Sequence, residues 1–400
     1  VGEIVEYAGR DLRHPDGAFF AAEDADSEGE EGTFYLWRLG EFEKFFPPAD
    51  IEWLRVLLSV RPEGNFGAAH GGAAGANILY LHEDFPEAAA RLEMPEADLL
   101  RRWENARQAL FEARRRRPRP HRDDKILADW NGLMIAALAK AGAALDEPDW
   151  IAAASRAADF ILERLGDGSG RLRHSWRDGA SAAPGLASDY AAMAWGLIEL
   201  YEAGGDARHL RRALELTEAL RAHFQDPESG GFFFTPDDGE KLLVRSRELY
   251  DGAIPSGNSI AFANLIRLAR LLGRPDLEEA AWRMARIYGD ALEQSPSAFT
   301  HFLSALSSGL ATSSEVVVTG PPDAPETAAL LQAVRRAFLP GTSLLYAPDG
   351  KDGGALAELV PFVRELPRRD GPAAYVCRGF ACQAPVSDSA SLRRALGLPD

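Results

Sequence analysis

The sequence predicts a mainly α-helical fold: an (α/α) toroid of helical hairpins, incomplete at its first hairpin, with a small C-terminal α/β appendix. Three observations predict it. Ala-rich apolar segments recur along the chain, a charged amphipathic segment follows each of them, and strand-like and helical segments alternate near the end of the chain.

The repeated segments align without gaps and predict the inner helices of the toroid. They occupy residues 129–142, 189–204 and 257–273. Each begins with a polar or small residue that suits a helix start and ends at a glycine, which suits a helix stop. Because apolar residues occur on several sides of each segment, we expect these helices to be buried.

Each predicted inner helix is followed by a helix that is apolar on one stripe only. These outer helices cover 149–165, 207–224 and 275–292. Gly- and aromatic-rich loops lie between the hairpins, and their turn residues predict short β-hairpins at one rim. The loops are 15–32, 167–179 and 227–239.

The pattern changes at Glu315, where strand-like segments begin to alternate with helical ones. This alternation predicts a βαβαβ unit with a parallel sheet. We therefore expect a toroid domain over 1–313 and an appendix over 314–400. The first residues, 1–12, resemble the second half of a helical hairpin, so we expect the chain to be a fragment or a processed form.

Composition excludes several classes of partner. The 44 Lys and Arg against 61 Asp and Glu give a net charge of −17, which disfavours nucleic acid as a partner. No apolar run approaches the ~20 residues that cross a bilayer. With two cysteines and no signal peptide, we expect a cytoplasmic protein. The basic stretch 114–122 is expected to pair with acidic loops such as 23–31 or with an anionic group of a substrate.

Several long strings closely resemble one family, the YyaL-like, spermatogenesis-associated, thioredoxin-domain-containing proteins. They are EDADSEGEEGTFYLW at 23–37, RPHRDDKILADWNGLMIAALA at 119–139, KLLVRSRELYDGAIPSGNS at 241–259 and AYVCRGFACQAP at 374–385. The resemblance implies a toroid similar to six-hairpin glycosidases and N-acylglucosamine 2-epimerases, without a settled reaction. Family members usually begin with a thioredoxin-like domain bearing Cys-x-x-Cys. That motif is absent from this sequence, so no redox activity is carried over.

The acidic loop at 23–31 is the first candidate site, through Glu23, Asp24 and Asp26. Three interpretations remain open: a solvated turn that caps the following helix, an acid or base facing a carbohydrate, and a cation site. Asp24, Asp26 and Glu28 match the start of an EF-hand loop. The twelfth position, however, is Tyr35 rather than Glu.

Polar and aromatic residues at the starts of the inner helices are the second candidate site. We expect them to face one central space, where aromatic rings could stack on a sugar and polar groups could bind its hydroxyls. Ordinary helix capping is the alternative for each of them. The residues are Asp129, Trp130, Asn131, Asp189, Tyr190, Asp251, Ser256 and Asn258.

Two reactions fit different candidate residues. Glycoside hydrolysis needs two carboxyl groups, one from Glu23, Asp24 or Asp26 and one from Asp129, Asp189 or Asp251. Sugar epimerisation needs a base and an acid, for which His174 and His301 are the candidates.

The sequence therefore predicts a carbohydrate-active or carbohydrate-binding domain that acts through rim carboxylates on a small sugar. One alternative is a 2-epimerase-like isomerase, and another is a non-catalytic scaffold that partners a thioredoxin-like domain or chain. Whether the domain is an enzyme stays open. We expect no cofactor and no metal site, since neither a P-loop nor a dinucleotide fingerprint is present. Cys377 and Cys382 are expected to be free thiols rather than redox or metal groups.

Overall fold

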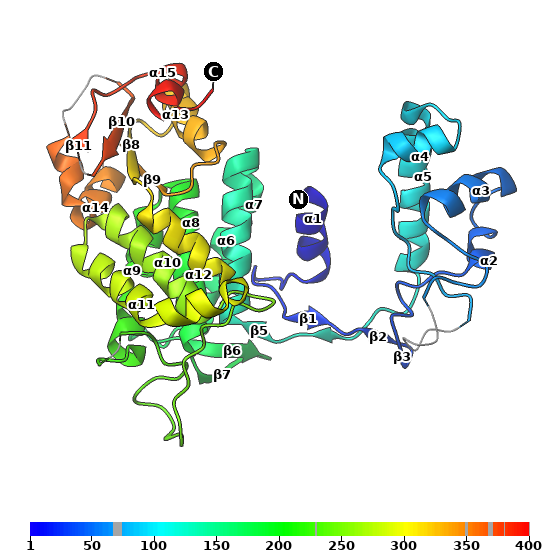
Figure 1. Ribbon diagram of the computed structural model, residues 1–400, viewed down its shortest axis with the longest axis horizontal. Coiled ribbons are helices and arrows are strands. Elements are labelled where there is room, and N and C mark those ends of the chain that lie inside the picture. The colour runs from blue at the N-terminus through cyan, green and yellow to red at the C-terminus, as the bar shows by residue number, and fades with distance from the viewer. Residues whose placement is uncertain (67–73, 229, 349–350, 367–370, 380, 400) are drawn as a thin grey trace. The chain divides into compact units, whose positions relative to one another are not determined.

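The computed structural model describes residues 1–66, 74–228, 230–348, 351–366, 371–379 and 381–399. The chain folds into two compact units, one formed by Ala22–Asp123 and the other by Val1–Ala21 with Asp124–Asp400 (Figure 1). These units differ from the predicted division at residue 313. Residues 22–123 form a unit of their own. The C-terminal α/β segment belongs to the same unit as the helical hairpins and shares a hydrophobic core with them.

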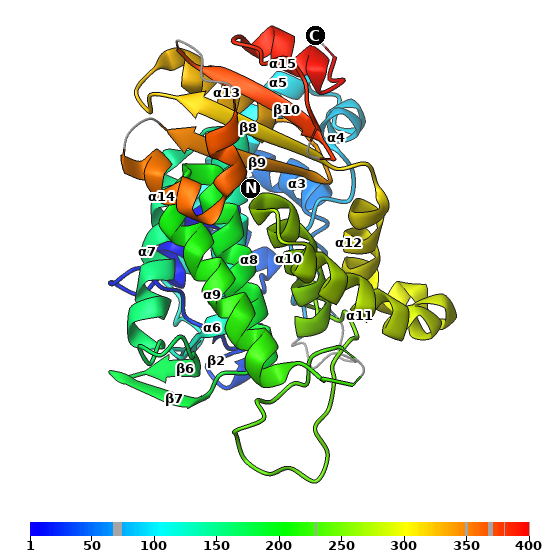
Figure 2. The same cartoon turned by 90° about the vertical axis from the view of Figure 1, so that its left-hand side faces the viewer.

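The larger unit is built from two layers of helices, as the repeat predicts (Figure 2). The inner helices are α6 (Ala128–Leu145), α8 (Ala187–Gly204), α10 (Gly257–Leu272) and α12 (Thr300–Leu310). The outer helices are α7 (Pro148–Arg164), α9 (Ala207–Phe224) and α11 (Pro275–Gln294), preceded along the chain by the separate helix α1 (Gly2–Asp11). Helices α8 and α10 are buried on most sides and α9 and α11 on one stripe. The predicted mainly helical fold class is confirmed.

The predicted helix stops hold for two of the three repeats. Helix α10 ends at Leu272 and is capped by the predicted Gly273, and α8 ends at the predicted Gly204 and is capped by Gly205. Both capping glycines have positive φ, as helix ends often require. The predicted stop at Gly142 is wrong, because α6 continues to Leu145 and Asp146 takes the left-handed conformation instead. Gly142 lies inside the helix, where an added Cβ would be 2.8 Å from Ile151 Cγ1. No helix of the described segments is long and apolar enough to cross a membrane.

Helices α6 and α8 approach each other backbone to backbone. A Cβ added at Gly132 would come within 2.6 Å of the Ala192 carbonyl oxygen, and one at Gly196 would lie 2.8 Å from the Gly132 oxygen. Real Cβ atoms do not approach other atoms this closely, so only glycine fits at these two positions. Asn264 of α10 then donates a hydrogen bond to the Ala191 oxygen of α8 at 2.8 Å, which links the next inner helix.

The rim loops form the predicted β structure in part. Strands β5 (Ile126–Leu127), β6 (Arg173–Arg177) and β7 (Ala180–Pro184) make an antiparallel sheet beside the start of α6. The other two loops that belong to this unit contribute single bridges, Arg13 with Phe19 and Gln225 with Phe232. A 3-10 turn, Pro296–Ala298, precedes α12.

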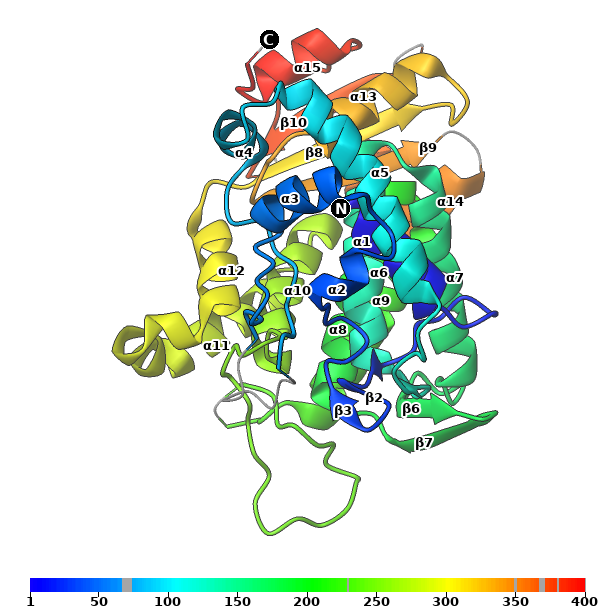
Figure 3. The ribbon, with the colours of Figure 1, turned by 90° about the vertical axis from the view of Figure 1, so that its right-hand side faces the viewer.

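The C-terminal segment is a four-stranded sheet in the order β11-β10-β8-β9, at one end of the helical layers (Figure 3). Its strands are β8 (Ser314–Gly320), β9 (Thr342–Pro348), β10 (Ala373–Arg378) and β11 (Ala381–Cys382). Its helices are α13 (Pro325–Arg335), α14 (Lys351–Leu359) and α15 (Ser389–Ala395), with a 3-10 turn at Pro361–Glu365. Val317, Leu345 and Tyr375 pack on the hairpin helices, whereas Val316 and Val318 pack in a second cluster on the opposite face.

The expectation of an all-parallel sheet is wrong. Strands β8 and β9 are parallel, but β10 runs antiparallel to β8. For β10 to run parallel to β8, α14 would have to cross from β9 to β10 over the sheet face that already packs on the hairpin helices. Helix α14 instead contributes Leu356 to the hairpin core, and β10 returns in the opposite direction.

The expectation of free thiols is also wrong. Cys377 and Cys382 are directly opposite each other in the β10–β11 hairpin and form a disulfide. The turn after Arg378 allows this, because it reverses the chain and brings residues five positions apart face to face.

The smaller unit contains a helical core and short paired strands. Its helices are α2 (Leu39–Phe42), α3 (Pro48–Leu57), α4 (Phe85–Arg91) and α5 (Glu96–Arg115). Its strands are β1 (Ala22–Glu23), β2 (Asp26–Ser27), β3 (Glu30–Glu31) and β4 (Arg122–Asp123). Arg119 binds Glu23 at 2.6 Å, which confirms that the basic stretch pairs with the acidic loop. Arg117 donates to the carbonyls of Phe34 and Leu36 and covers the Trp37 ring.

The α6–α8 contact predicts a large effect of a single methyl group. Gly132→Ala is expected to lower the free energy of unfolding by about 1–3 kcal/mol, since the added carbon overlaps the backbone of α8. Gly289→Ala in α11 is the matched control, because an added Cβ meets nothing within 4 Å there. The control should be neutral or gain up to about 1 kcal/mol from helix propensity. Urea unfolding measures both, and equal stability of the two variants would contradict the close contact.

Candidate functional site

Two of the predicted ligand-binding residues hold the rim loops instead. Asn131 accepts a hydrogen bond from the Phe19 N–H at 2.8 Å and donates to the Phe19 carbonyl at 2.9 Å. Asn258 makes the same pair of bonds with Phe232, at 2.8 and 2.9 Å. Each amide thus acts as one partner of a β-bridge. Both side chains are buried and occupied by backbone groups of the chain itself.

Tyr190, Asp251 and Ser256 are also engaged within the chain. The Tyr190 hydroxyl accepts from the Leu172 N–H at 2.9 Å. Asp251 caps α12 by accepting from the N–H groups of His301 and Phe302, and Ser256 caps α10. These buried groups fit the alternative of helix capping and loop attachment better than ligand binding.

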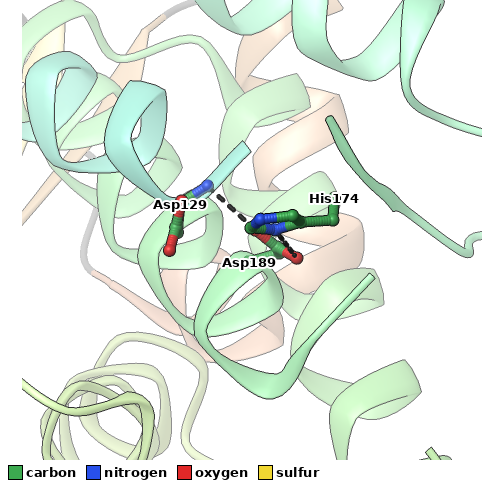
Figure 4. A group of neighbouring side chains, drawn as sticks. All are labelled: Asp129, His174 and Asp189. Atoms are coloured by element: carbon green, nitrogen blue, oxygen red, sulfur yellow. Dashed lines mark hydrogen bonds and ion pairs between the residues drawn. The ribbon is translucent and has the colours of Figure 1, made fainter. Parts of the chain in front are cut away.

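The structure does bring Asp129, His174 and Asp189 together at the rim (Figure 4). His174 Nδ1 lies 3.0 Å from both carboxylate oxygens of Asp189. Asp189 Oδ1 also accepts from the Asp129 N–H at 3.1 Å, and its Oδ2 accepts from the Leu186 N–H at 2.7 Å. Because both oxygens already act as acceptors, His174 Nδ1 carries the hydrogen in the bond to Asp189.

Burial sets the charges of this cluster. It raises the pKa of Asp189 to about 6, although the hydrogen bond from His174 counteracts this. The hydrogen bond to Asp189 in turn raises the pKa of His174. Burial also raises the pKa of Asp129, whose carboxylate accepts from the Trp130 N–H at 2.8 Å. The Trp130 side chain beside it is 43% exposed.

A cation could take one atom from each of these three residues, since those atoms all lie within 4.8 Å of one another. Such an ion would compete with the backbone N–H groups and with His174 for the same Asp189 oxygens. The cluster therefore fits a clasp that joins α6, α8 and β6 better than an ion site.

The predicted acids of the loop at 23–31 lie in the smaller unit, outside the Asp129 cluster. Glu23 binds Arg119, and Asp24 Oδ1 accepts from the Asp26 N–H at 3.2 Å to close a turn. Asp26 is paired with Glu31 in the β2–β3 hairpin. These contacts match the interpretation of the loop as an exposed turn.

A cavity of about 370 Å³ lies between the four inner helices and the loop from α13 to β9. Its lining comes from the second halves of α6 and α8, from the middle and end of α10, and from α12 beginning with His301 in its first turn. Its size falls within the range of small-molecule sites, roughly 300–1,000 Å³. Alanines leave this space open on all four inner helices: Ala143 on α6, Ala203 on α8, Ala263 on α10 and Ala305 on α12.

A network of charged side chains forms one wall of this cavity. Arg267 binds Glu199 at 2.6 Å through Nη1 and Glu202 at 2.8 Å through Nη2. Lys140 Nζ lies 3.5 Å from Glu199, and the Trp195 indole donates to the same carboxylate at 3.0 Å. Burial alone would raise the pKa of Glu199, but Arg267 and Lys140 hold it below its usual value.

His301 lines the same cavity and packs against Trp195 with the two rings tilted by 41° and 5.1 Å between their centroids. Within the described residues, neither ring nitrogen of His301 has a hydrogen-bond partner. Burial lowers its pKa, although Asp251 counteracts this, so the ring is neutral at neutral pH. His301 was predicted from the sequence. His174, its predicted partner, does not line the cavity.

Sequence reasoning missed the charged residues of the cavity. Glu199 and Arg267 occupy the same position of the repeat, inside helices that are otherwise apolar, and Lys140 is similarly placed in the first copy. A charged residue within a buried helix is the signal that could have identified them, because such a residue needs a partner or a cavity.

No protein-family model matches the sequence. The chain is similar to human spermatogenesis-associated protein 20, with 32% identity over 422 residues that cover 98% of this chain and 54% of the human protein. An uncharacterised Caenorhabditis elegans protein is 29% identical over 96% of this chain and 55% of its own length. The chain thus spans about half the length of the curated relatives it matches.

Solved structures give partial matches. Cellobiose 2-epimerase from Spirochaeta thermophila has a TM-score of 0.35 at 20% identity, over 41% of this chain and 43% of the epimerase. Unsaturated glucuronyl hydrolase from Bacillus sp. GL1 has a TM-score of 0.35 at 18% identity, over 42% of this chain and 46% of the hydrolase. Because these matches cover less than half of the chain at low TM-scores, they indicate nothing about the activity of this protein.

The rim clasp predicts how His174 titrates. Asp189→Asn is expected to lower the pKa of His174, because the variant removes the carboxylate that favours the imidazolium. In the unaltered protein, His174 should titrate above the ordinary value of about 6.5. Asp178→Asn is the matched control on the same β-hairpin, where Asp178 is exposed, and it should leave the pKa unchanged. NMR titration of labelled histidine measures these values. An unchanged His174 pKa in Asp189→Asn would contradict the contact.

Proposed function

We propose that this chain binds a small sugar in the inner cavity and that the neutral imidazole of His301 performs acid–base chemistry on it. The observation that carries the proposal is the state of His301. Its ring lines a cavity of ligand size, has no hydrogen-bond partner among the described residues, and is uncharged at neutral pH. His301 is partly exposed, but its Nε2 atom is buried, and a buried nitrogen without a partner is costly unless a ligand or water completes its hydrogen bond.

The walls of the cavity support a sugar as the ligand. Trp195 supplies an aromatic surface of the kind on which sugar rings stack. Glu199 and Glu202 supply acceptors for hydroxyl groups, and Ser304 and Ser308 supply hydroxyls that both donate and accept. This mixture of apolar surface and a few converging polar groups is typical of small-molecule sites.

Proton transfer fits this cavity better than two-carboxylate hydrolysis. Hydrolysis needs carboxyl groups on opposite sides of a glycosidic bond, separated by roughly 5–9.5 Å. Glu199 and Glu202 are instead bound to the two ends of one guanidinium, that of Arg267. His301, in contrast, is neutral and able to accept a proton. The isomerase alternative is therefore the form of the proposal that we favour.

The activity of a full-length protein is a wider question, because the curated relatives are about twice as long as this chain. The scaffold hypothesis, in which this chain partners a thioredoxin-like domain, stays a prediction. The cavity and the neutral His301 have no role in that hypothesis, so a ligand-binding experiment distinguishes it from the sugar proposal.

Isomerase chemistry predicts exchange of a carbon-bound hydrogen with solvent. When the protein is incubated with aldoses in D2O, we expect deuterium to enter the sugar at the carbon next to the carbonyl. The rate should rise with pH through a value below about 6.5 and then stay constant, because the pKa of His301 is lowered and only the neutral ring is a base. NMR spectroscopy of the sugar measures the exchange.

Paired histidine variants provide the controls. His301→Gln should abolish the exchange, whereas His174→Gln at the rim should leave it intact. Thermal unfolding of both variants confirms that they are folded. Exchange that depends on His174 and not on His301 would move the site to the rim cluster. If no aldose exchanges and none shifts the melting temperature, the proposed function is wrong.

A further inference from the structure

Positive charges outnumber negative ones around the inner cavity. Within the described residues, the side chains lining it include four basic residues and two carboxylates. They are Lys140, Arg267, Arg270 and Arg335 against Glu199 and Glu202. The protein as a whole has the opposite balance, with a net charge of −17. An excess of positive charge around a cavity of an acidic protein is a local feature that requires its own explanation.

Partners within the chain account for three of these four cations. Arg267 is held by the two carboxylates, and Lys140 lies beside Glu199 with its side chain 72% exposed. Arg270 donates to the carbonyl oxygens of Ser308 and Gly309 at 3.2 and 2.9 Å. Those carbonyls belong to the last turn of α12, where the helix supplies no N–H donors of its own for them.

Arg335 differs from the other three. It lies in the last turn of α13, and its Nε donates to the Glu202 carbonyl at 3.1 Å. Within the described residues, its terminal nitrogens have no ion-pair or hydrogen-bond partner. Burial lowers the pKa of Arg335 to about 10, although Glu202, Tyr346 and Asp146 counteract this. Arg335 therefore stays charged at neutral pH, and its planar fork lines the cavity without an anion bonded to it among the described residues.

The neighbouring Arg336 shows how the same side chain is normally accommodated here. It is 57% exposed and binds Asp146 Oδ2 at 3.2 Å, so solvent and a carboxylate both stabilise its charge. Arg335 has neither. A guanidinium fork that is half-buried beside a cavity matches the geometry of a carboxylate or a phosphate, which it can bind through two parallel hydrogen bonds.

We infer that the ligand of the inner cavity carries a carboxylate or phosphate group, and that Arg335 binds this group. This inference rests on the proposed function for the sugar body of the ligand, but the anion site itself does not. The ligand class is thus an acidic monosaccharide or a sugar phosphate, with its ring near Trp195 and His301 and its anionic group at Arg335.

Binding of matched probes tests the inference. Glucuronate, glucose 6-phosphate, glucose and inorganic phosphate are titrated into the whole chain, with calorimetry and melting temperature as readouts. We expect an acidic sugar to bind at least tenfold more tightly than glucose, because a charge-assisted pair is about twice as strong as a neutral hydrogen bond. The two acidic probes distinguish a carboxylate site from a phosphate site. The preference should shrink as salt is added.

Two variants separate Arg335 from general electrostatics. Arg335→Gln should reduce the affinity for the acidic sugar to that for glucose and leave glucose binding unchanged. Arg336→Gln removes the same charge one residue away and should change neither affinity. If Arg335→Gln does not fold, the test uses the unaltered protein alone. A preference for the acidic sugars over glucose that shrinks with added salt would support the inference, and no such preference would overturn it.

The outcomes distinguish the two proposals. Equal affinity for glucose and both acidic sugars would overturn the inference and leave the proposed function standing. Binding of inorganic phosphate that Arg335→Gln abolishes, without binding of any sugar, would support the anion site and contradict the sugar proposal. If no probe binds, both proposals are wrong.

Discussion

The close contact between α6 and α8 is the constraint on which the rest of the larger unit depends. Gly132 and Gly196 let the two backbones touch, and this brings the first turns of both helices together. Only then can Asp189 accept the Asp129 N–H and hold His174 of the rim sheet at the same time. The same two helices line one side of the inner cavity, where Ala143 of α6 and Ala203 of α8 leave space. This packing contact thus positions the rim clasp and one side of the cavity.

The polar side chains at the starts of the inner helices and those around the inner cavity have different roles. At the helix starts, polar side chains hold the rim loops and cap helices, so their hydrogen bonds are already complete. Around the cavity, charged and aromatic side chains surround open space, and His301 and Arg335 keep polar atoms without partners among the described residues. Incomplete hydrogen bonding beside a cavity is the feature expected of a binding site, since a ligand can supply the missing partners.

The sequence predicted the helical pairs because each repeat has a strong 3.6-residue pattern, which local physics largely determines. It could not predict that β10 runs antiparallel to β8, because that depends on which sheet face the hairpin helices already cover. Nor could it predict the Cys377–Cys382 disulfide, which requires the β10–β11 turn. For the site, Asp129, Asp189 and His174 were predicted and do lie together, and His301 was predicted and lines the cavity. The sequence analysis missed Glu199, Arg267 and Arg335. Helix periodicity predicts on which side of a helix a residue lies, but it does not predict whether that side packs against another element or lines a cavity.

We propose that the ligand binds in the inner cavity and not at the rim. Labelled histidine gives the most direct test, because His301 belongs to the cavity and His174 to the rim. In a nitrogen NMR titration with glucuronate, we expect the resonances of the His301 ring nitrogens to shift in a saturable way and those of His174 to stay unchanged. A saturable shift of the His174 resonances, with those of His301 unchanged, would contradict ligand binding in the inner cavity.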